Sequence, residues 1–261
     1  RMRAHAPTHC LAVGCEDGSV RLFDTGSGPG AELRYVRVLG RHPARVLSLS
    51  WQPSGRHLAS GAYDGSILLH HLQTAAVVQR MTAAGDPKTG AIVWDLHVLS
   101  DGASLVAVDS ARAVTVFELK RGTPTVTVSE HDADATCVCV DEEAGAIFAG
   151  GLDGKVVQLT AQALDGRARG PGEGPKRRPS SHWRWIFSAS RRVHTHDILA
   201  LELCRPARGG RARVVSAGVD SVLCALPTAA PLARAGGKGP AGGWLHSTPR
   251  KVLPFPQRSP L

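Results

Sequence analysis

Aspartates that recur in one short pattern are the first candidates for chemistry in this 261-residue chain. Asp17, Asp64, Asp153 and Asp220 each stand between two short apolar runs, and the first three precede a glycine. Paired carboxylates could serve as a general acid and a general base. Asp-Gly between apolar runs is also a strong signal for a β-hairpin turn, where the carboxylate hydrogen-bonds the local backbone. Because each aspartate lies in a different repeat, we expect four structural residues and no catalytic pair.

Histidine and cysteine side chains could bind a metal ion or act as nucleophiles. His194 and His196 would point to one face of a strand and could supply two ligands, but no third ligand follows at a metal-like spacing. Cys137 and Cys139 lie in an apolar run, which suits small buried side chains. The six cysteines include no CxxC pair, so we expect reduced thiols in an intracellular protein.

Two glycine-rich segments, 26–30 and 170–175, are the candidates for a phosphate-binding loop. Neither contains the GxxxxGK[ST] motif, and neither is a GxGxxG segment between a strand and a helix. We therefore expect no nucleotide, metal or other cofactor, no small-molecule substrate and no enzymatic activity.

The segment 176–192, KRRPSSHWRWIFSASRR, combines six basic residues with three aromatic ones. Lys and Arg neutralise phosphates, exposed aromatic rings stack on unpaired bases, and PKRRP at 175–179 has the composition of a nuclear-import cluster. We expect this segment to contact RNA, another protein or an import receptor; the remaining alternative is an outer strand with a solvated charged edge. The candidate contact residues are Lys176, Arg177, Arg178, Trp183, Arg184, Trp185, Arg191 and Arg192.

The net charge of +9 is concentrated in the last part of the chain. Residues 1–160 hold 14 basic and 17 acidic residues, whereas residues 161–261 hold 17 basic and 5 acidic ones. Such an uneven excess favours a polyanionic partner or a basic tail. No apolar run approaches the roughly 20 residues that cross a bilayer, and the chain shows no signal-peptide pattern. We expect no membrane association.

An internal repeat supplies the elements that must position these residues. Five segments align around turns at Asp17, Asp64, Ala111, Asp153 and Asp220, which are spaced by 47, 47, 42 and 67 residues. Most of these spacings lie near the roughly 40–45 residues of a propeller blade. Each unit has a further apolar run before its hairpin, and most have a fourth after it. Four strands per unit predict an all-β protein with a β-propeller fold, and the alternative is another all-β repeat or a sandwich.

The residues around these turns resemble the WD-repeat pattern. In that family a His before the first strand, a Ser or Thr on the next strand and the turn Asp form a buried hydrogen-bonded set. The tryptophan that the family carries near the end of the third strand is missing, and His70 stands near that place in the second unit. The residues that the resemblance assigns to this set are Asp17; His42, Ser60 and Asp64; His131 and Asp153; and His196, Ser216 and Asp220.

Longer segments, among them 11–23, 45–55 and 194–201, are similar to the cirhin family of nucleolar WD-repeat subunits of the small-subunit processome. The resemblance covers about residues 11–226 and implies an incomplete propeller, with about four to five of seven blades present. It implies a non-enzymatic scaffold of the nucleolus and nucleus that acts in pre-rRNA processing, small-subunit rRNA maturation and ribosome biogenesis, and that supports RNA polymerase I transcription. The implied partners are other WD-repeat and scaffold subunits of the processome and pre-ribosomal RNA, contacted directly or indirectly.

The resemblance also sets the expected domain organisation. We expect a partial propeller over residues 1–226 with a basic insertion at 161–193, followed by a poorly ordered Gly/Ala/Pro-rich segment at 227–261. The chain is expected to be a fragment of a longer protein, and to aggregate alone because its blade faces and sheet edges are open. The alternative function is a WD-repeat adaptor or substrate receptor of a ubiquitin ligase or a signalling complex.

Overall fold

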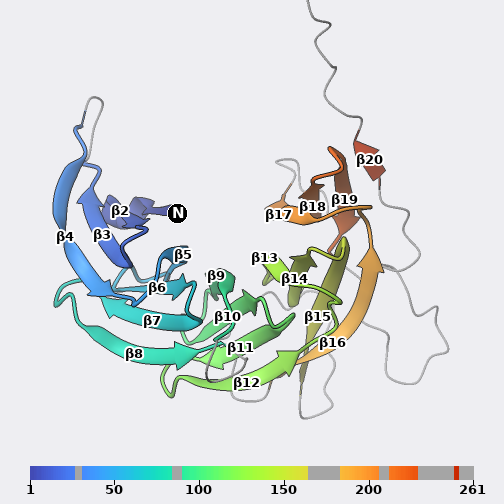
Figure 1. Cartoon of the computed structure of the whole chain (residues 1–261), viewed down its shortest axis with the longest axis horizontal. Helices are drawn as coiled ribbons and strands as arrows, with labels where there is room; N and C mark the ends of the chain where they lie inside the picture. The colour runs from blue at the N-terminus through green and yellow to red at the C-terminus, as the bar shows by residue number, and fades with distance from the viewer. Residues whose placement is uncertain (27–30, 84–89, 164–182, 206–211, 229–249, 253–261) are drawn as a thin grey trace, which may run out of the picture. The chain divides into compact units, whose positions relative to one another are not determined.

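The computed structural model describes residues 1–26, 31–83, 90–163, 183–205, 212–228 and 250–252 (Figure 1). The chain divides into two compact units, Arg1–Ser129 and Glu130–Leu261. Within the described ranges the structure consists of β-strands and one short 3-10 helix, which confirms the all-β prediction. No helix in these ranges is long and apolar enough to cross a membrane.

The first unit contains three four-stranded antiparallel sheets, in each of which the strands pair in chain order. The first sheet is formed by β1 (Met2–His5), β2 (Cys10–Gly14), β3 (Ser19–Asp24) and β4 (Arg34–Arg41), with the 3-10 helix η1 (Ala6–Thr8) between β1 and β2. The second is formed by β5 (Val46–Trp51), β6 (His57–Ala62), β7 (Ser66–His71) and β8 (Val77–Thr82). The third is formed by β9 (Val93–Val98), β10 (Ser104–Asp109), β11 (Val114–Glu118) and β12 (Thr123–Val128).

The second unit contains two sheets of the same kind. The fourth sheet is formed by β13 (Ala135–Asp141), β14 (Ala146–Gly151), β15 (Lys155–Ala163) and β16 (Trp183–Arg192). The fifth is formed by β17 (Ile198–Cys204), β18 (Arg213–Gly218), β19 (Leu223–Pro227) and β20 (Arg250–Val252). Repeated four-stranded antiparallel sheets are the blades of a β-propeller, so the five sheets match the five turns that the sequence indicates.

The Asp-Gly turns close the central hairpin of three sheets. Gly18, Gly65 and Gly154 have φ angles of +79°, +82° and +71°, a region that glycine enters without strain. A Cβ atom on Gly18 would lie 2.2 Å from the carbonyl oxygen of His42. Backbone conformation and close approach therefore both require glycine at this turn, which explains why the motif marks the hairpins so clearly.

Buried apolar side chains pack neighbouring sheets together within each unit. In the first unit, Val20 and Leu22 on β3 belong to one cluster with Leu58 on β6, and a second cluster joins the second and third sheets. In the second unit, Val156 on β15 packs in a cluster with Ile198 on β17. Full burial of one such side chain contributes about 1.5–3 kcal/mol. These apolar faces hold the hairpin turns and their polar side chains in place.

Two expectations about the C-terminal half need revision. β20 lies inside the segment 227–261, and it pairs with β19 through Leu223 and Val252. That part of the segment is therefore a strand of the fifth sheet, and residues 229–249 and 253–261 lie outside the described residues. The expected insertion 161–193 is in part the end of β15 and the whole of β16, because these two strands form one long antiparallel pair.

Candidate functional site

His42, which lies four residues before β5, is the centre of a buried hydrogen-bonded chain in the second sheet. Its Nδ1 atom lies 2.6 Å from Ser66 Oγ, and its Nε2 atom lies 2.7 Å from Ser60 Oγ. Ser66 Oγ in turn donates to Asp64 Oδ1 at 2.7 Å. The structure thus brings His42, Ser60 and Asp64 together as the sequence indicates, but the aspartate reaches the histidine through a serine that sequence reasoning missed.

His70 on β7 continues this chain to the first sheet. Its Nε2 atom lies 2.7 Å from Ser60 Oγ, and its Nδ1 atom accepts the N–H of Gly40 on β4 at 3.2 Å. Because the Ser66 hydroxyl donates to the carboxylate, it must accept from Nδ1–H of His42. Ser60 then donates to Nε2 of His42 and accepts from Nε2–H of His70. Every group is satisfied with both imidazoles neutral.

Burial keeps both imidazoles in this neutral state. Burial lowers the pKa of His42 to about 4, an effect that the Asp64 carboxylate opposes and the Arg80 guanidinium reinforces. Burial lowers the pKa of His70 to about 3, with further lowering by His42 and Arg80. A catalytic base at neutral pH needs a pKa near the working pH. These histidines are therefore suited to structural hydrogen bonding and not to proton transfer.

His131 occupies the position in the fourth sheet that His42 occupies in the second, and its ring has one hydrogen-bond partner fewer. Its Nδ1 atom lies 3.2 Å from each carboxylate oxygen of Asp153, and the backbone N–H of Asp132 donates to the same carboxylate at 2.9 Å. The buried Nε2 atom of His131 has no hydrogen-bond partner among the described residues. The position that corresponds to Ser60 is Ala149 in this sheet, so the hydroxyl that would reach Nε2 is missing.

The fifth sheet corrects the prediction for His196. His194 occupies the buried place, with Nδ1 2.9 Å from Asp220 Oδ1 and Nε2 2.8 Å from Ser216 Oγ. His196 is exposed and bonds locally to the Thr195 hydroxyl at 3.0 Å. The physical reason is the distance to the next strand, because His194 precedes Ile198 by four residues, as His42 precedes Val46. That spacing is the signal by which the sequence could have shown the correct histidine.

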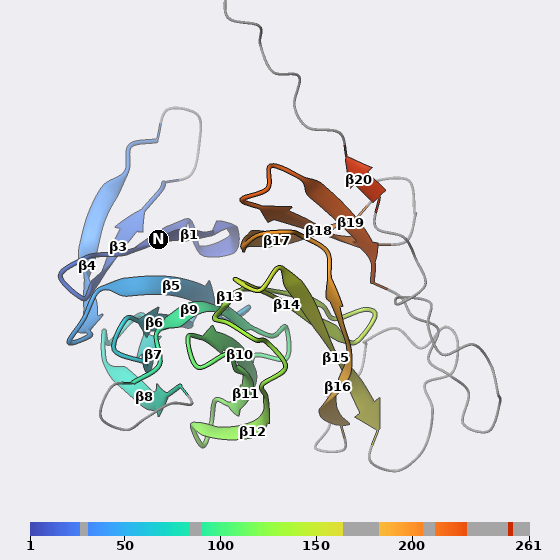
Figure 2. The same ribbon diagram turned by 45° about the vertical axis from the view of Figure 1, so that its right-hand side comes forward.

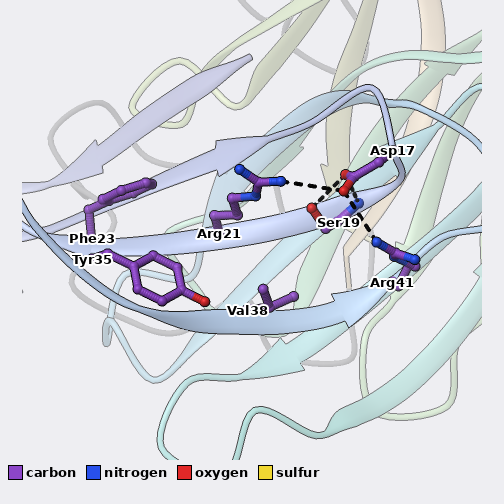
Figure 3. Close-up of a pocket in the computed structure, with 7 residues that line it drawn as sticks. All are labelled: Asp17, Ser19, Arg21, Phe23, Tyr35, Val38 and Arg41. Atoms are coloured by element: carbon purple, nitrogen blue, oxygen red, sulfur yellow. Dashed lines mark hydrogen bonds and ion pairs between the residues drawn. The ribbon is translucent and has the colours of Figure 1, made fainter.

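Asp17 lies in a hollow of about 410 Å³ on the outer face of β3 and β4 (Figure 3). Its Oδ1 atom accepts the hydroxyl of Ser19 at 2.6 Å and the N–H of the same residue at 2.9 Å. Arg41 and Arg21 approach its Oδ2 atom at 3.2 and 3.4 Å. The Ser19 hydroxyl and N–H, followed by the two guanidinium groups, lower the pKa of Asp17 to about 2. A carboxylate held in this way is an anchor for the turn and a poor proton donor.

The far end of the hollow is aromatic. The rings of Phe23 and Tyr35 meet edge to face at a centroid distance of 5.7 Å, and Tyr35 is exposed. The positions that correspond to Arg21 in the other four sheets are the buried Leu68, Thr115, Val157 and Cys224. The hollow therefore exists because this sheet face is open, and it contains no pair of groups poised for acid–base catalysis.

The predicted contact segment has a mixed outcome. Lys176, Arg177 and Arg178 lie outside the described residues. The other five candidates, Trp183, Arg184, Trp185, Arg191 and Arg192, belong to β16, the edge strand of the fourth sheet (Figure 2). This placement agrees with the outer-strand alternative that the sequence left open. The arginines among these candidates therefore lie on the edge strand of the sheet.

Metal-binding and redox chemistry have no assembled site in the parts of the chain that the structure describes. No group of three His, Cys, Asp or Glu residues there could hold a metal ion. His194 and His196, which the sequence placed on one strand face, lie in the connection before β17, where one is buried and the other exposed. Cys137 and Cys139 are buried, and they pack in the apolar core of the second unit.

Comparison with known proteins identifies the repeat. Residues 33–71 match the family model described as WD domain, G-beta repeat. The structure is similar to the crystal structure of the Cps50 (Swd1) β-propeller domain of Myceliophteria thermophila, with a TM-score of 0.62 and 16% identity, over 87% of this chain and 63% of that one. The chain therefore has a WD-repeat β-propeller fold, as predicted.

Curated relatives match over most of the chain. A Schizosaccharomyces pombe protein named U3 small nucleolar RNA-associated protein 4 is 34% identical over 225 residues, which are 84% of this chain and 28% of the relative. The Homo sapiens homolog is 29% identical over 221 residues, 83% of this chain and 29% of the relative. The Saccharomyces cerevisiae protein of that name is 27% identical over 218 residues, which are 82% of this chain and 26% of the relative. The chain thus spans less than a third of the length of these relatives.

Proposed function

We propose that this chain is a non-enzymatic scaffold of the small-subunit processome, acting in the nucleolus in pre-rRNA processing, small-subunit rRNA maturation and ribosome biogenesis. The observation that carries the proposal is the similarity over more than four fifths of the chain to proteins named for their association with U3 small nucleolar RNA. The proposed partners are other WD-repeat and scaffold subunits of the processome and pre-ribosomal RNA. Support of RNA polymerase I transcription is part of the same proposal.

The architecture supports a role as a platform. Rigid four-stranded sheets present their turns and edge strands to partners without needing a catalytic group. The turn carboxylates are engaged locally, because Asp17 and Asp64 bind serine side chains and Asp153 and Asp220 bind histidines. Because these carboxylates already have structural partners, we assign partner binding to the surface of the sheets.

The basic β15–β16 pair supports contact with a polyanion or an acidic neighbour. The two strands contain Lys155, Arg184, Arg191 and Arg192 and no acidic residue. A processome subunit works beside RNA phosphates, and Lys and Arg side chains attract them strongly at low salt. This strand pair is therefore the proposed contact region, and residues 176–178 add three basic residues to the same segment of sequence.

Depletion of the gene product in its own cells, followed by blotting of ribosomal RNA precursors, tests the proposal. Accumulation of an early precursor and loss of small-subunit RNA, with large-subunit RNA spared, is the expected result. An unchanged precursor pattern would contradict it. Recovery of the tagged protein from the same cells then discriminates the adaptor alternative, because a processome subunit brings down U3 RNA whereas an adaptor brings down ubiquitin-ligase or signalling subunits.

A further inference from the structure

The side chains that line the hollow of the first sheet lie on one face of β3 and β4 (Figure 3). In the ladder between these strands, Arg21 lies opposite Val38 and Phe23 lies opposite Tyr35. Opposite residues of two strands share a face, and so do alternate residues of one strand. Tyr35 is 58% exposed and Val38 is 42% exposed. The face therefore combines a cationic side chain with accessible apolar and aromatic ones.

The same face of the second sheet is buried. Leu11 and Val13 on β2 extend the open face of the first sheet, and both are partly exposed. The four corresponding residues of the second sheet are each at most 1% exposed, and they are Leu58, Ser60, Leu68 and His70. The apolar cluster that joins Leu22 to Leu58 shows that the first sheet covers them. On the first sheet this face stays accessible among the described residues, and its apolar side chains mark it as an interface.

Charge identifies what this interface accepts. Arg21 and Arg41 both pair with Asp17, at 3.4 and 3.2 Å, and neither has another carboxylate partner among the described residues. The three groups leave one positive charge in excess, and the two arginine side chains are 48% and 65% exposed. A neutral surface laid over them would bury an uncompensated cation, which is unfavourable. A carboxylate would neutralise the excess charge and accept charge-assisted hydrogen bonds from the guanidinium groups.

We propose that the open face of the first sheet binds an acidic segment of a partner protein. One Asp or Glu carboxylate of that segment binds Arg21 and Arg41, and its apolar side chains pack on Tyr35 and Val38. The inference goes beyond the proposed function, because it depends on the described side chains and not on the similarity to named relatives.

Two other occupants fit the face less well. Val215 and Ala225 on the fifth sheet are partly exposed, so a second copy of the chain could supply an apolar face. Its outer strand β20 consists of Arg250, Lys251 and Val252, and this strand would bring further cations instead of a carboxylate. RNA carries a phosphate at every nucleotide and is bound by the neutralisation of several of them, whereas the hollow has a single positive charge in excess.

Photo-crosslinking of the full gene product in its own cells tests the proposal. The photoreactive aromatic residue p-benzoyl-phenylalanine replaces Tyr35, because Tyr35 is an exposed ring at the apolar end of the hollow. The expected product is a covalent complex with another protein, and mass spectrometry should find an Asp or Glu close to the crosslinked site of that protein. Exchange of this acidic residue for its amide should lower the crosslink yield.

Variants of the two arginines separate charge recognition from folding. Arg21→Leu should lower the crosslink yield at least about 10-fold, because the carboxylate of the partner loses its cation. The second sheet has Leu68 at this position, so the fold accepts the side chain. Arg41→Gln, at the more exposed arginine, should lower the yield in the same direction. Arg121→Leu is the matched control, because Arg121 is an exposed, ion-paired arginine of the third sheet, and it should leave the yield within twofold. Equal abundance of the variants in the cells shows that a lower yield does not come from loss of the fold.

The other outcomes contradict the inference. A crosslink within the same polypeptide, to a second copy or to RNA would overturn it, and so would the absence of a crosslinked product. A crosslinked partner segment without an acidic residue, or a yield that does not depend on Arg21, would overturn it as well.

Discussion

Ser60 on β6 lies 2.7 Å from Nε2 of His70 on β7, and this contact within the second sheet is the middle of a hydrogen-bonded network that reaches the first sheet. On one side, His70 accepts the backbone N–H of Gly40 in the first sheet. On the other, Ser60 reaches His42 and, through Ser66, the turn carboxylate of Asp64. Each donor in this hydrogen-bonded network has one acceptor, so its buried polar groups are satisfied only when all of them are present.

Removal of the central hydroxyl should therefore be costly. Ser60→Ala leaves Nε2 of both His42 and His70 without a partner in a buried place. A buried group that loses its partner costs about 1–3 kcal/mol, so the free energy of unfolding in urea should fall by at least that amount. Ser129→Ala, at an exposed serine of the same unit, should change it by less than about 0.5 kcal/mol. Equal stability of the two variants would show that the network contributes nothing.

The network also predicts a loss of stability in mild acid. The pKa of His42 is about 4 and that of His70 about 3 in the folded chain, against 6.5 for an unperturbed histidine. Below pH 6.5 the unfolded chain binds protons that the folded chain does not, so the free energy of unfolding falls as pH decreases from about 6.5 to about 4. The slope from two histidines is about 2.7 kcal/mol per pH unit. Urea unfolding at several pH values measures it.

A matched variant isolates the contribution of His70 to this slope. Phe117 is buried at the corresponding place of the third sheet, so His70→Phe substitutes a side chain that this fold accepts. The variant should lower the slope between pH 6.5 and 4 by about 1.4 kcal/mol per pH unit. The lowered pKa of Asp17 and Asp220, about 2 in both against 3.8 for an unperturbed carboxyl, adds to the slope as the pH approaches 3.8, but it is common to both chains and cancels in their difference. An unchanged slope would show that His70 does not remain neutral.

Sequence reasoning located the inner strands because their apolar runs end at strong turn signals. The run 45–51 became β5 and the run 135–140 became β13, each shifted by at most one residue. The outer strands β1, β4 and β20 gave no such signal. β4 is exposed at its first five residues, so its composition follows neither the alternation of a half-buried strand nor the continuous apolar run of a buried one.

The sequence predicted that buried hydrogen-bonded sets exist, but it did not predict all of their members correctly. The resemblance to WD repeats assigned His42 and Ser60 to one set, but it did not show that Ser66 stands between His42 and Asp64. It also placed His196 where the structure has His194, because two histidines on one apparent strand face are equivalent by periodicity alone. The distance of four residues to the next strand separates them, and that distance requires knowledge of where the strand begins.

The assignment of the fifth-sheet histidine is directly testable. His194→Ala removes a buried ring that contacts Asp220 and Ser216, so the free energy of unfolding should fall by about 1–3 kcal/mol through the unpaired groups left behind. His196→Ala removes an exposed ring and should stay within about 0.5 kcal/mol of the parent chain. The pair is matched in residue type and lies two positions apart. A larger loss for His196→Ala would restore the prediction made from the sequence.

The fourth sheet offers the opposite experiment, in which a missing partner is supplied. Nε2 of His131 is buried without a partner among the described residues, and Ala149 holds the place that Ser60 and Ser216 hold in two other sheets. Ala149→Ser should give that atom a hydroxyl and raise the free energy of unfolding by about 1 kcal/mol. Ala149→Cys is the control, because a thiol fills similar volume and hydrogen-bonds weakly. If the two variants are equally stable, any gain in the free energy of unfolding comes from packing. If Ala149→Ser is less stable than the parent chain, the His131 ring has no need of a second hydrogen-bond partner.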